Sequence, residues 1–186
     1  MTRNYLIAIA INKGFPMILP KVRDSRLILE RRGGSLSAEN HRLLALWAAE
    51  CAEHVLLHFE KMYPEDDRPR VAIEKTRKWA NGEIKVTEAK EAAYYANKAA
   101  QGKKGAAKMA AMAAGQAAAV AHVAAHDLGA AAYAIRAVME ASDEESREKN
   151  KSIECLWQRS KLPKEVKKLV IEDEMNRNEI CWNVFI

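Results

Sequence analysis

Four histidines are spaced as two pairs that could bind a metal ion. His54 and His58 lie four residues apart in one segment that favours helix, and His122 and His126 repeat this spacing in another. Side chains four residues apart share one face of a helix, where two imidazoles can reach the same ion. If the two faces met, four nitrogens and the carboxylate of Glu50 would suit zinc or another divalent transition metal.

A structural role explains the same spacing. Four-helix carboxylate metal sites use Glu-x-x-His and zinc hydrolases use His-Glu-x-x-His, and neither motif occurs in the sequence. Buried histidines bonded to a carboxylate or to Tyr133 would give the same pattern, and we favour this polar-core interpretation. We therefore expect no cofactor. The alternative is a metal-binding or hydrolytic helical-bundle enzyme that uses His54, His58, His122 and His126.

A charged loop between two predicted helices is the best candidate for a binding surface. Residues 64–70 read Pro-Glu-Asp-Asp-Arg-Pro-Arg, so that Asp66, Arg68 and Arg70 lie close together. We expect these three side chains to contact a partner. The alternative is a helix cap at Asp67 with local ion pairs, which contribute little to stability when exposed.

Motifs of common enzyme classes are missing. The sequence has no Gly-rich phosphate loop, no Cys-x-x-Cys pair and no Gly-x-Ser-x-Gly nucleophile motif. It therefore favours a non-enzymatic protein over an enzyme. The three cysteines are an odd number without paired spacing, which is typical of a reducing compartment, and we expect a cytoplasmic protein.

The candidate side chains need a helical scaffold, and its centre is predicted to be the alanine-rich stretch from Gly105 to Val138. Alanine is the best helix former, so this stretch is expected to be one long helix. It is apolar nearly all round, which indicates burial. Its glycines are expected to leave room for a neighbouring helix, the one that carries the face from Trp47 to His58.

The fold class is predicted to be all-α, a single-domain bundle of about six helices around the central one. Besides the central helix, patterns and caps predict helices over residues 37–62, 68–80, 87–102, 142–160 and from Pro163 onward. Ser142 is expected to begin a capping box. The bundle occupies residues 36–186, and its apolar C-terminal tail should dock on it.

Residues 1–35 are predicted to form a basic, partly extended arm. They hold seven Lys or Arg and two Asp or Glu, so they carry the whole net charge of +5 and the body is neutral. The apolar run Tyr5–Ile11 suits a short strand or a docked arm better than a signal peptide. Since no basic stripe marks the body, nucleic-acid binding is disfavoured, and no membrane span is expected because His and Asp interrupt the central helix.

Four blocks of the sequence are similar to those of one family. They are Trp47–Leu56; Asp66–Arg70 with Ala72-Ile73, Trp79 and Gly82-Glu83; Ala114–Ala119 with Ala121–His126 and Ala131–Ala134; and Trp157-Gln158, Leu162-Pro163, Arg177-Asn178 and Cys181-Trp182. The blocks span about residues 39–185 and resemble the all-helical putative immunity proteins of bacterial polymorphic toxin systems. The resemblance implies a small cytoplasmic protein that binds and silences a cognate toxin, with no catalytic residues. It leaves homo-oligomerisation open.

Overall fold

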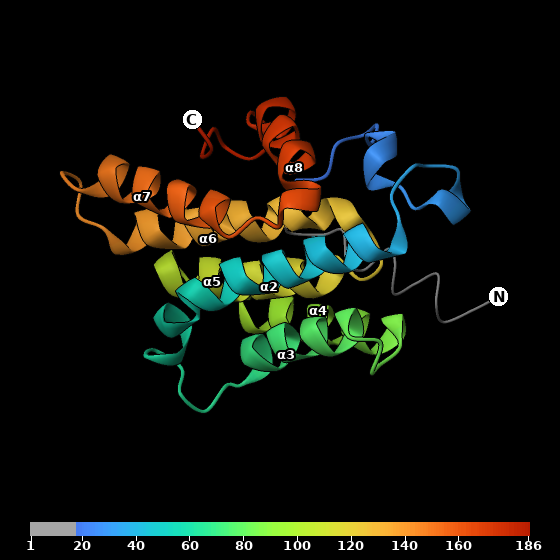
Figure 1. The fold of residues 1–186 in the computed structure, drawn as a ribbon. Helices are drawn as coiled ribbons and strands as arrows, with labels where there is room; N and C mark the ends of the chain where they lie inside the picture. Colours follow the sequence, from blue (N-terminus) through green and yellow to red (C-terminus); the bar gives the residue numbers. More distant parts are fainter. Residues whose placement is uncertain (1–17) are drawn as a thin grey trace.

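Seven α-helices carry the fold of the computed structural model, which describes residues 18–186 (Figure 1). They are α2 (Ala38–Glu60), α3 (Arg68–Ala80), α4 (Val86–Ala99), α5 (Gly105–Ala119), α6 (Asp127–Ala141), α7 (Arg147–Ser160) and α8 (Lys164–Arg177). No β-strand occurs in this described part of the chain. The all-α prediction is confirmed, whereas the predicted strand or arm over Tyr5–Ile11 lies outside the described residues.

Successive helices from α2 to α7 alternate in direction, and α8 crosses over α6 (Figure 1). Helix α5 lies at the centre and contacts α2, α3, α4 and α6. Eleven of its fifteen residues are buried, and most of these are alanine. Because small side chains allow helix axes to approach closely, the alanine-rich sequence suits a helix that is surrounded by four others.

The alanine-rich stretch forms two helices, so the prediction of one long central helix is wrong. Helix α5 ends at Ala119 and α6 begins at Asp127, and the connection between them contains a short 3-10 helix, η3 (Ala124–His126). The two helices turn back on each other and pack side by side.

At this break several backbone carbonyls have no helical hydrogen-bond donor. Side chains from helices that are distant in sequence donate hydrogen bonds to them instead. The Nε2 atom of His41 donates a hydrogen bond to the Val120 carbonyl at 2.6 Å. The Nη1 atom of Arg177 donates to the Ala125 carbonyl at 2.8 Å. An interrupted helix leaves carbonyls without partners, and burying them unpaired would be costly. Tertiary partners therefore override the helix propensity of alanine at this point.

Two glycines allow close contact between helices, as predicted, but with other partners. A Cβ atom on Gly115 would lie 2.3 Å from Oδ1 of Asn97 in α4. A Cβ atom on Gly129 would lie 2.5 Å from Oε1 of Gln116 in α5. The glycines thus accommodate polar side chains of α4 and α5 rather than the predicted face of α2.

Local signals place several helix ends correctly. Ser37 caps α2 by accepting a hydrogen bond from the Asn40 amide at 3.1 Å. Pro69 lies in the first turn of α3, where its missing N–H has no cost. Gly82 follows that helix with a φ of +79°, which is the left-handed conformation expected of a C-terminal glycine.

The predicted start of α7 is wrong by five residues. Ser142 does not begin a capping box: its hydroxyl donates to the Val138 carbonyl at the end of α6 and accepts a hydrogen bond from the Asn150 side-chain amide rather than from the backbone of the next helix. Asp143 accepts a hydrogen bond from the Ser146 amide at 2.7 Å, and the helix begins at Arg147.

The segments outside the long helices pack on the bundle. Residues 18–36 contain two short 3-10 helices, η1 (Ser25–Leu27) and η2 (Glu30–Arg32). At the other end the tail is docked as predicted, since Val184 and Phe185 are buried. Within residues 18–186, no helix combines the length and apolarity that crossing a bilayer requires.

Candidate functional site

The two histidine pairs lie toward opposite ends of α2. His41 in the first turns of α2 bonds to Val120, which places the connection containing His122 and His126 at that end. His54 comes thirteen residues after His41 in the same helix, or about 20 Å along its axis. The structure therefore does not bring the four histidines together. In the described part of the chain, no three His, Cys, Asp or Glu side chains are grouped so that they could hold a metal ion.

His54 is bonded to a carboxylate, but its side chain is 41% exposed, so it is not the buried histidine that the polar-core interpretation expects. Its Nδ1 atom donates to Oε2 of Glu154 in α7 at 2.9 Å. Its ring stacks on that of Trp157, with 3.6 Å between the centroids and 10° between the planes. Glu154 is 3% exposed and also accepts from the Gln158 amide at 2.9 Å. The imidazole is thus held on two sides.

His122 and His126 form a second, separate arrangement. Their ring centroids are 5.2 Å apart, and Nδ1 of His126 donates to Oε1 of Gln116 at 2.7 Å. Burial lowers the pKa of His122 to about 4 and that of His126 to about 3. Both imidazoles are therefore neutral at pH 7, although both side chains are only half-buried, in the connection at the end of the bundle.

The remaining residues predicted for metal or partner binding make local ion pairs. Glu50 lies 3.1 Å from the Lys161 ammonium group. Arg68 pairs with Asp66 through two hydrogen bonds of 2.7 and 2.6 Å. Arg70 pairs with a carboxylate of α2, Glu60, through bonds of 2.6 and 2.9 Å. The role of Asp66, Arg68 and Arg70 in partner binding stays a prediction.

Helix α7 has an unusual distribution of polar and apolar residues. It buries Glu154 and Gln158, whereas Ile153 is 54% exposed and Leu156 is 65% exposed. A surface helix normally buries its apolar residues and exposes its charged ones. Helix α7 does the opposite at these positions, with a buried carboxylate beside exposed branched side chains. The exposed side of α7 therefore has a composition suited to contact with another molecule.

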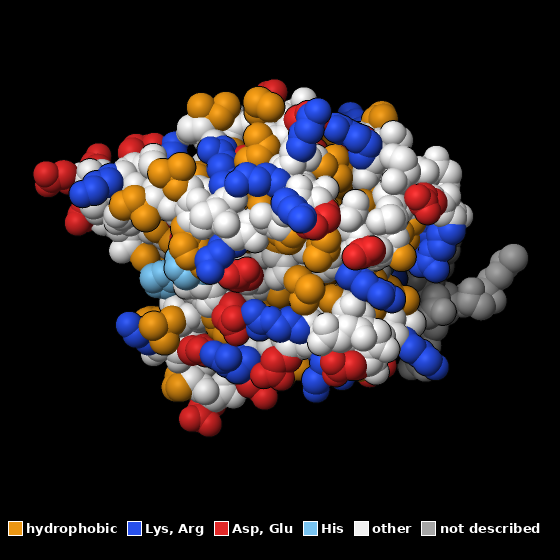
Figure 2. Space-filling view, in the orientation of Figure 1, with side chains coloured by type: hydrophobic (Ala, Val, Ile, Leu, Met, Phe, Trp, Pro, Cys, Tyr) orange, Lys and Arg blue, Asp and Glu red, His pale blue; other side chains and the backbone are white. Residues whose placement is uncertain are grey.

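This apolar surface continues onto α2. Leu57 is 56% exposed and lies one turn after His54, which stacks on Trp157 of α7. In Figure 2 histidine side chains lie beside hydrophobic ones where α7 passes the C-terminal half of α2. We call this surface the α2–α7 patch, and its members are His54, Leu57, His58, Ile153, Leu156 and Trp157. Contiguous exposed apolar groups of this kind mark interaction sites.

Ion pairs border the α2–α7 patch. Lys161 and Glu50 pair at one margin, and Glu53 accepts two hydrogen bonds from Arg77 of α3, the shorter of them 2.6 Å. An apolar centre with a charged, solvent-accessible border is the usual anatomy of a protein–protein interface.

Sequence reasoning missed the members of the patch on α7. It named Trp157 as part of the family resemblance and did not single out Ile153 or Leu156. The available signal was their spacing, since positions 153, 156 and 157 form one stripe on an otherwise charged helix. That stripe predicts an apolar face, but it does not tell whether the face is turned inward or outward.

Comparison with known proteins identifies one family. A family model described as "Imm-5 like putative immunity protein" matches residues 34–165, which is more than half of the chain and includes α2 to α7. A search of curated proteins found no match, and neither did a search of solved structures.

Proposed function

The chain belongs to the Imm-5 like putative immunity proteins, and from this membership we propose that it binds a cognate toxin stoichiometrically and neutralises it by occlusion. The proposed activity is non-enzymatic. It requires a surface that recognises a protein, and the α2–α7 patch is the surface with the composition for it.

The observation that carries the proposal is the inverted polarity of α7. Exposing Ile153 and Leu156 costs free energy in the isolated protein, because each apolar side chain would stabilise the fold if it were buried. A partner that covers these side chains recovers that free energy on binding. The cost in the free protein is thus explained by the gain in the complex.

The patch also supplies an ordered anchor. Trp157 is stacked on His54, and the hydrogen bond to Glu154 fixes the orientation of the imidazole. Tryptophan is enriched among residues that dominate binding energies. A side chain that is held in place before binding loses little conformational entropy on association.

Charged residues around the patch support recognition of the partner. Asp66 in the loop after α2, with Arg68 and Arg70 in the first turn of α3, extends the charged border. Exposed border charges mainly accelerate association and exclude wrong partners. We assign these three residues that secondary role.

We also propose that the protein acts in the cytoplasm of the cell that makes the toxin. The three cysteines, Cys51, Cys155 and Cys181, are free and buried. Free thiols persist in reducing compartments, where a toxin would need to be silenced before export.

The direct test is complex formation with the toxin encoded beside this gene. The complex is measured by size-exclusion chromatography, and neutralisation is measured as the survival of cells that express the toxin. Leu156→Asp places a charge in the patch, and Met175→Asp on α8 is the matched control because Met175 is 62% exposed outside it. We expect the first variant to lose the complex and the second to retain it. A complex that survives Leu156→Asp would refute the assigned surface, and recovery of the wild-type protein without any toxin would refute the function.

A further inference from the structure

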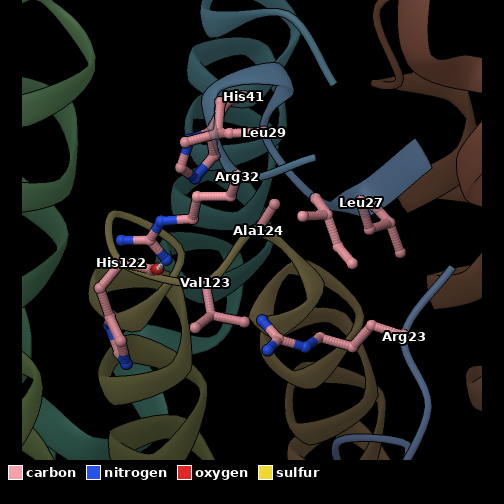
Figure 3. Close-up of a pocket in the computed structure, with 9 residues that line it drawn as sticks. Arg23, Leu27, Leu29, Arg32, His41, His122, Val123 and Ala124 are labelled. Atoms are coloured by element: carbon pink, nitrogen blue, oxygen red, sulfur yellow. Dashed lines mark hydrogen bonds between the residues drawn. The ribbon is translucent and has the colours of Figure 1, made fainter. Parts of the chain in front are cut away.

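A small cavity lies at the end of the bundle away from the α2–α7 patch (Figure 3). It has a volume of about 20 Å³ and lies between the segment before α2 and the connection between α5 and α6. Two arginines, Arg23 and Arg32, line it together with apolar side chains that include Leu29 and Val123. In Figure 3 both guanidinium groups extend toward the Val123 region from different sides.

The two guanidinium groups carry charge that no described carboxylate neutralises. Arg32 makes one hydrogen bond, to the His122 carbonyl at 3.4 Å, and this leaves most of its five N–H donors available. Neither Arg23 nor Arg32 forms an ion pair within residues 18–186. Asp24, which is next to Arg23 in sequence, is held by Arg26 through a 2.7 Å ion pair.

The neighbouring histidines report the same positive environment. The pKa of His41 lies below its ordinary value because of burial and then because of the charges of Arg31 and Arg32. Burial lowers the pKa of His122 in the same way, with Lys90 and Arg32 adding to the effect. No carboxylate opposes these shifts, so the cavity and its mouth are electropositive.

We propose that Arg23 and Arg32 form a binding site for one carboxylate group, supplied by an acidic side chain of the protein partner. The cavity is small, at about 20 Å³, which suits the end of one side chain, and Arg23 and Arg32 are both exposed, so the group enters from the surface. Guanidinium groups bind carboxylates through paired, charge-assisted hydrogen bonds. The apolar walls at Leu29 and Val123 suit the methylene groups of an aspartate or glutamate.

This site gives the partner a second, polar contact remote from the α2–α7 patch. Since the source of the carboxylate rests on the proposed function, the site itself is tested on the isolated protein. The probe is acetate, titrated into the isotope-labelled full-length chain at pH 7 and constant ionic strength. We expect saturable shifts of the Val123 and Ala124 amide signals, and about tenfold weaker binding in the variant Arg23→Gln/Arg32→Gln.

Arg147→Gln is the matched control, because Arg147 is exposed at the start of α7 and its loss changes the net charge in the same direction. It should bind acetate like the wild type. Equal, non-saturating shifts in the wild type and the double variant would overturn the site, and so would inorganic phosphate binding far more tightly than acetate. If acetate binds but no toxin is recovered, the site stands and the proposed function fails.

Discussion

The guanidinium group of Arg177 in α8 pairs with the carboxylate of Asp127, the first residue of α6, with 3.3 Å between Nη2 and Oδ1. Both side chains are buried, and Arg177 also holds Asp173 and donates to the Ala125 carbonyl. One cation therefore fixes the start of α6, the connection before it and the position of α8. This network links the last helix to the centre of the bundle.

Removal of the cation should destabilise the protein strongly. Arg177→Met leaves Asp127 and Asp173 buried without a counter-charge, and we expect the free energy of unfolding to fall by about 3–5 kcal/mol. Urea unfolding measures it. Arg147→Met, at an exposed position, should change it by less than about 0.5 kcal/mol. An equal effect of both variants would show that the network has no special role.

The free energy of unfolding should depend on pH, because two buried carboxylates, Asp127 and Asp173, share the single charge of Arg177 in this network. Burial raises the pKa of Asp127 to about 7. The native state then binds a proton more tightly than the unfolded state, so this stabilising contribution is complete below pH 4 and is lost as the pH rises through 7. Relative to Asp127→Asn, the wild type should lose about 2–4 kcal/mol between pH 4 and pH 7 in urea unfolding. Parallel pH profiles would contradict the shift.

Local sequence signals predicted several helix starts, although the capping box expected at Ser142 was wrong. Ser37 and Pro163 stand next to the helix starts that they mark, and their chemistry depends on the adjacent backbone. The break after Ala119 was not predictable in this way, because its carbonyl partners, His41 and Arg177, are remote in sequence. The one local hint was Asp127, an acidic residue suited to a helix start within an alanine run.

The candidate site was predictable only in part, for a similar reason. The spacing of His54 and His58 correctly predicts a shared region of one helix. It gives no information on the partner of the ring, since Glu154 lies 100 residues further along the chain. Likewise, the outward orientation of Ile153 follows from how α7 packs on α6, a tertiary property that no spacing encodes.

The contact between α4 and α5 should not tolerate a methyl group at Gly115. A Cβ atom there would meet Oδ1 of Asn97 at 2.3 Å, so Gly115→Ala should destabilise the protein by about 1–3 kcal/mol in thermal or urea unfolding. In the Asn97→Ala background only the Ala93 carbonyl oxygen stays close to the methyl group, at 3.3 Å, so the same substitution should cost less. The difference is a coupling energy of about 1 kcal/mol or more. If the effects of Gly115→Ala and Asn97→Ala were strictly additive, the strain would not come from the contact between these two residues.

Metal analysis tests the alternative based on the four histidines. Because His54 lies about 20 Å along α2 from His41, which marks the end of the helix near the connection with His122 and His126, we expect protein purified without a histidine tag to hold less than about a tenth of an equivalent of zinc. The melting temperature should be the same with and without a chelator. One equivalent of metal, with a lower melting temperature in chelator, would restore the metal-binding hypothesis.

The stacked pair of His54 and Trp157 should dominate the affinity for the partner. Trp157→Ala removes the ordered apolar anchor, and we expect a loss of about 2 kcal/mol or more in binding free energy by calorimetry, which is about thirtyfold in Kd. Tyr95→Ala is the control, since Tyr95 is also an exposed aromatic residue but lies on α4.

A second variant separates positioning from direct contact. Glu154→Gln keeps the shape of the buried side chain but weakens the hydrogen bond that orients His54. We expect it to weaken binding less than Trp157→Ala, mainly through faster dissociation, because a partly freed imidazole must be ordered again in the complex. If Tyr95→Ala weakened binding as much as Trp157→Ala, the interface would have to include α4, and the α2–α7 patch would not be its centre.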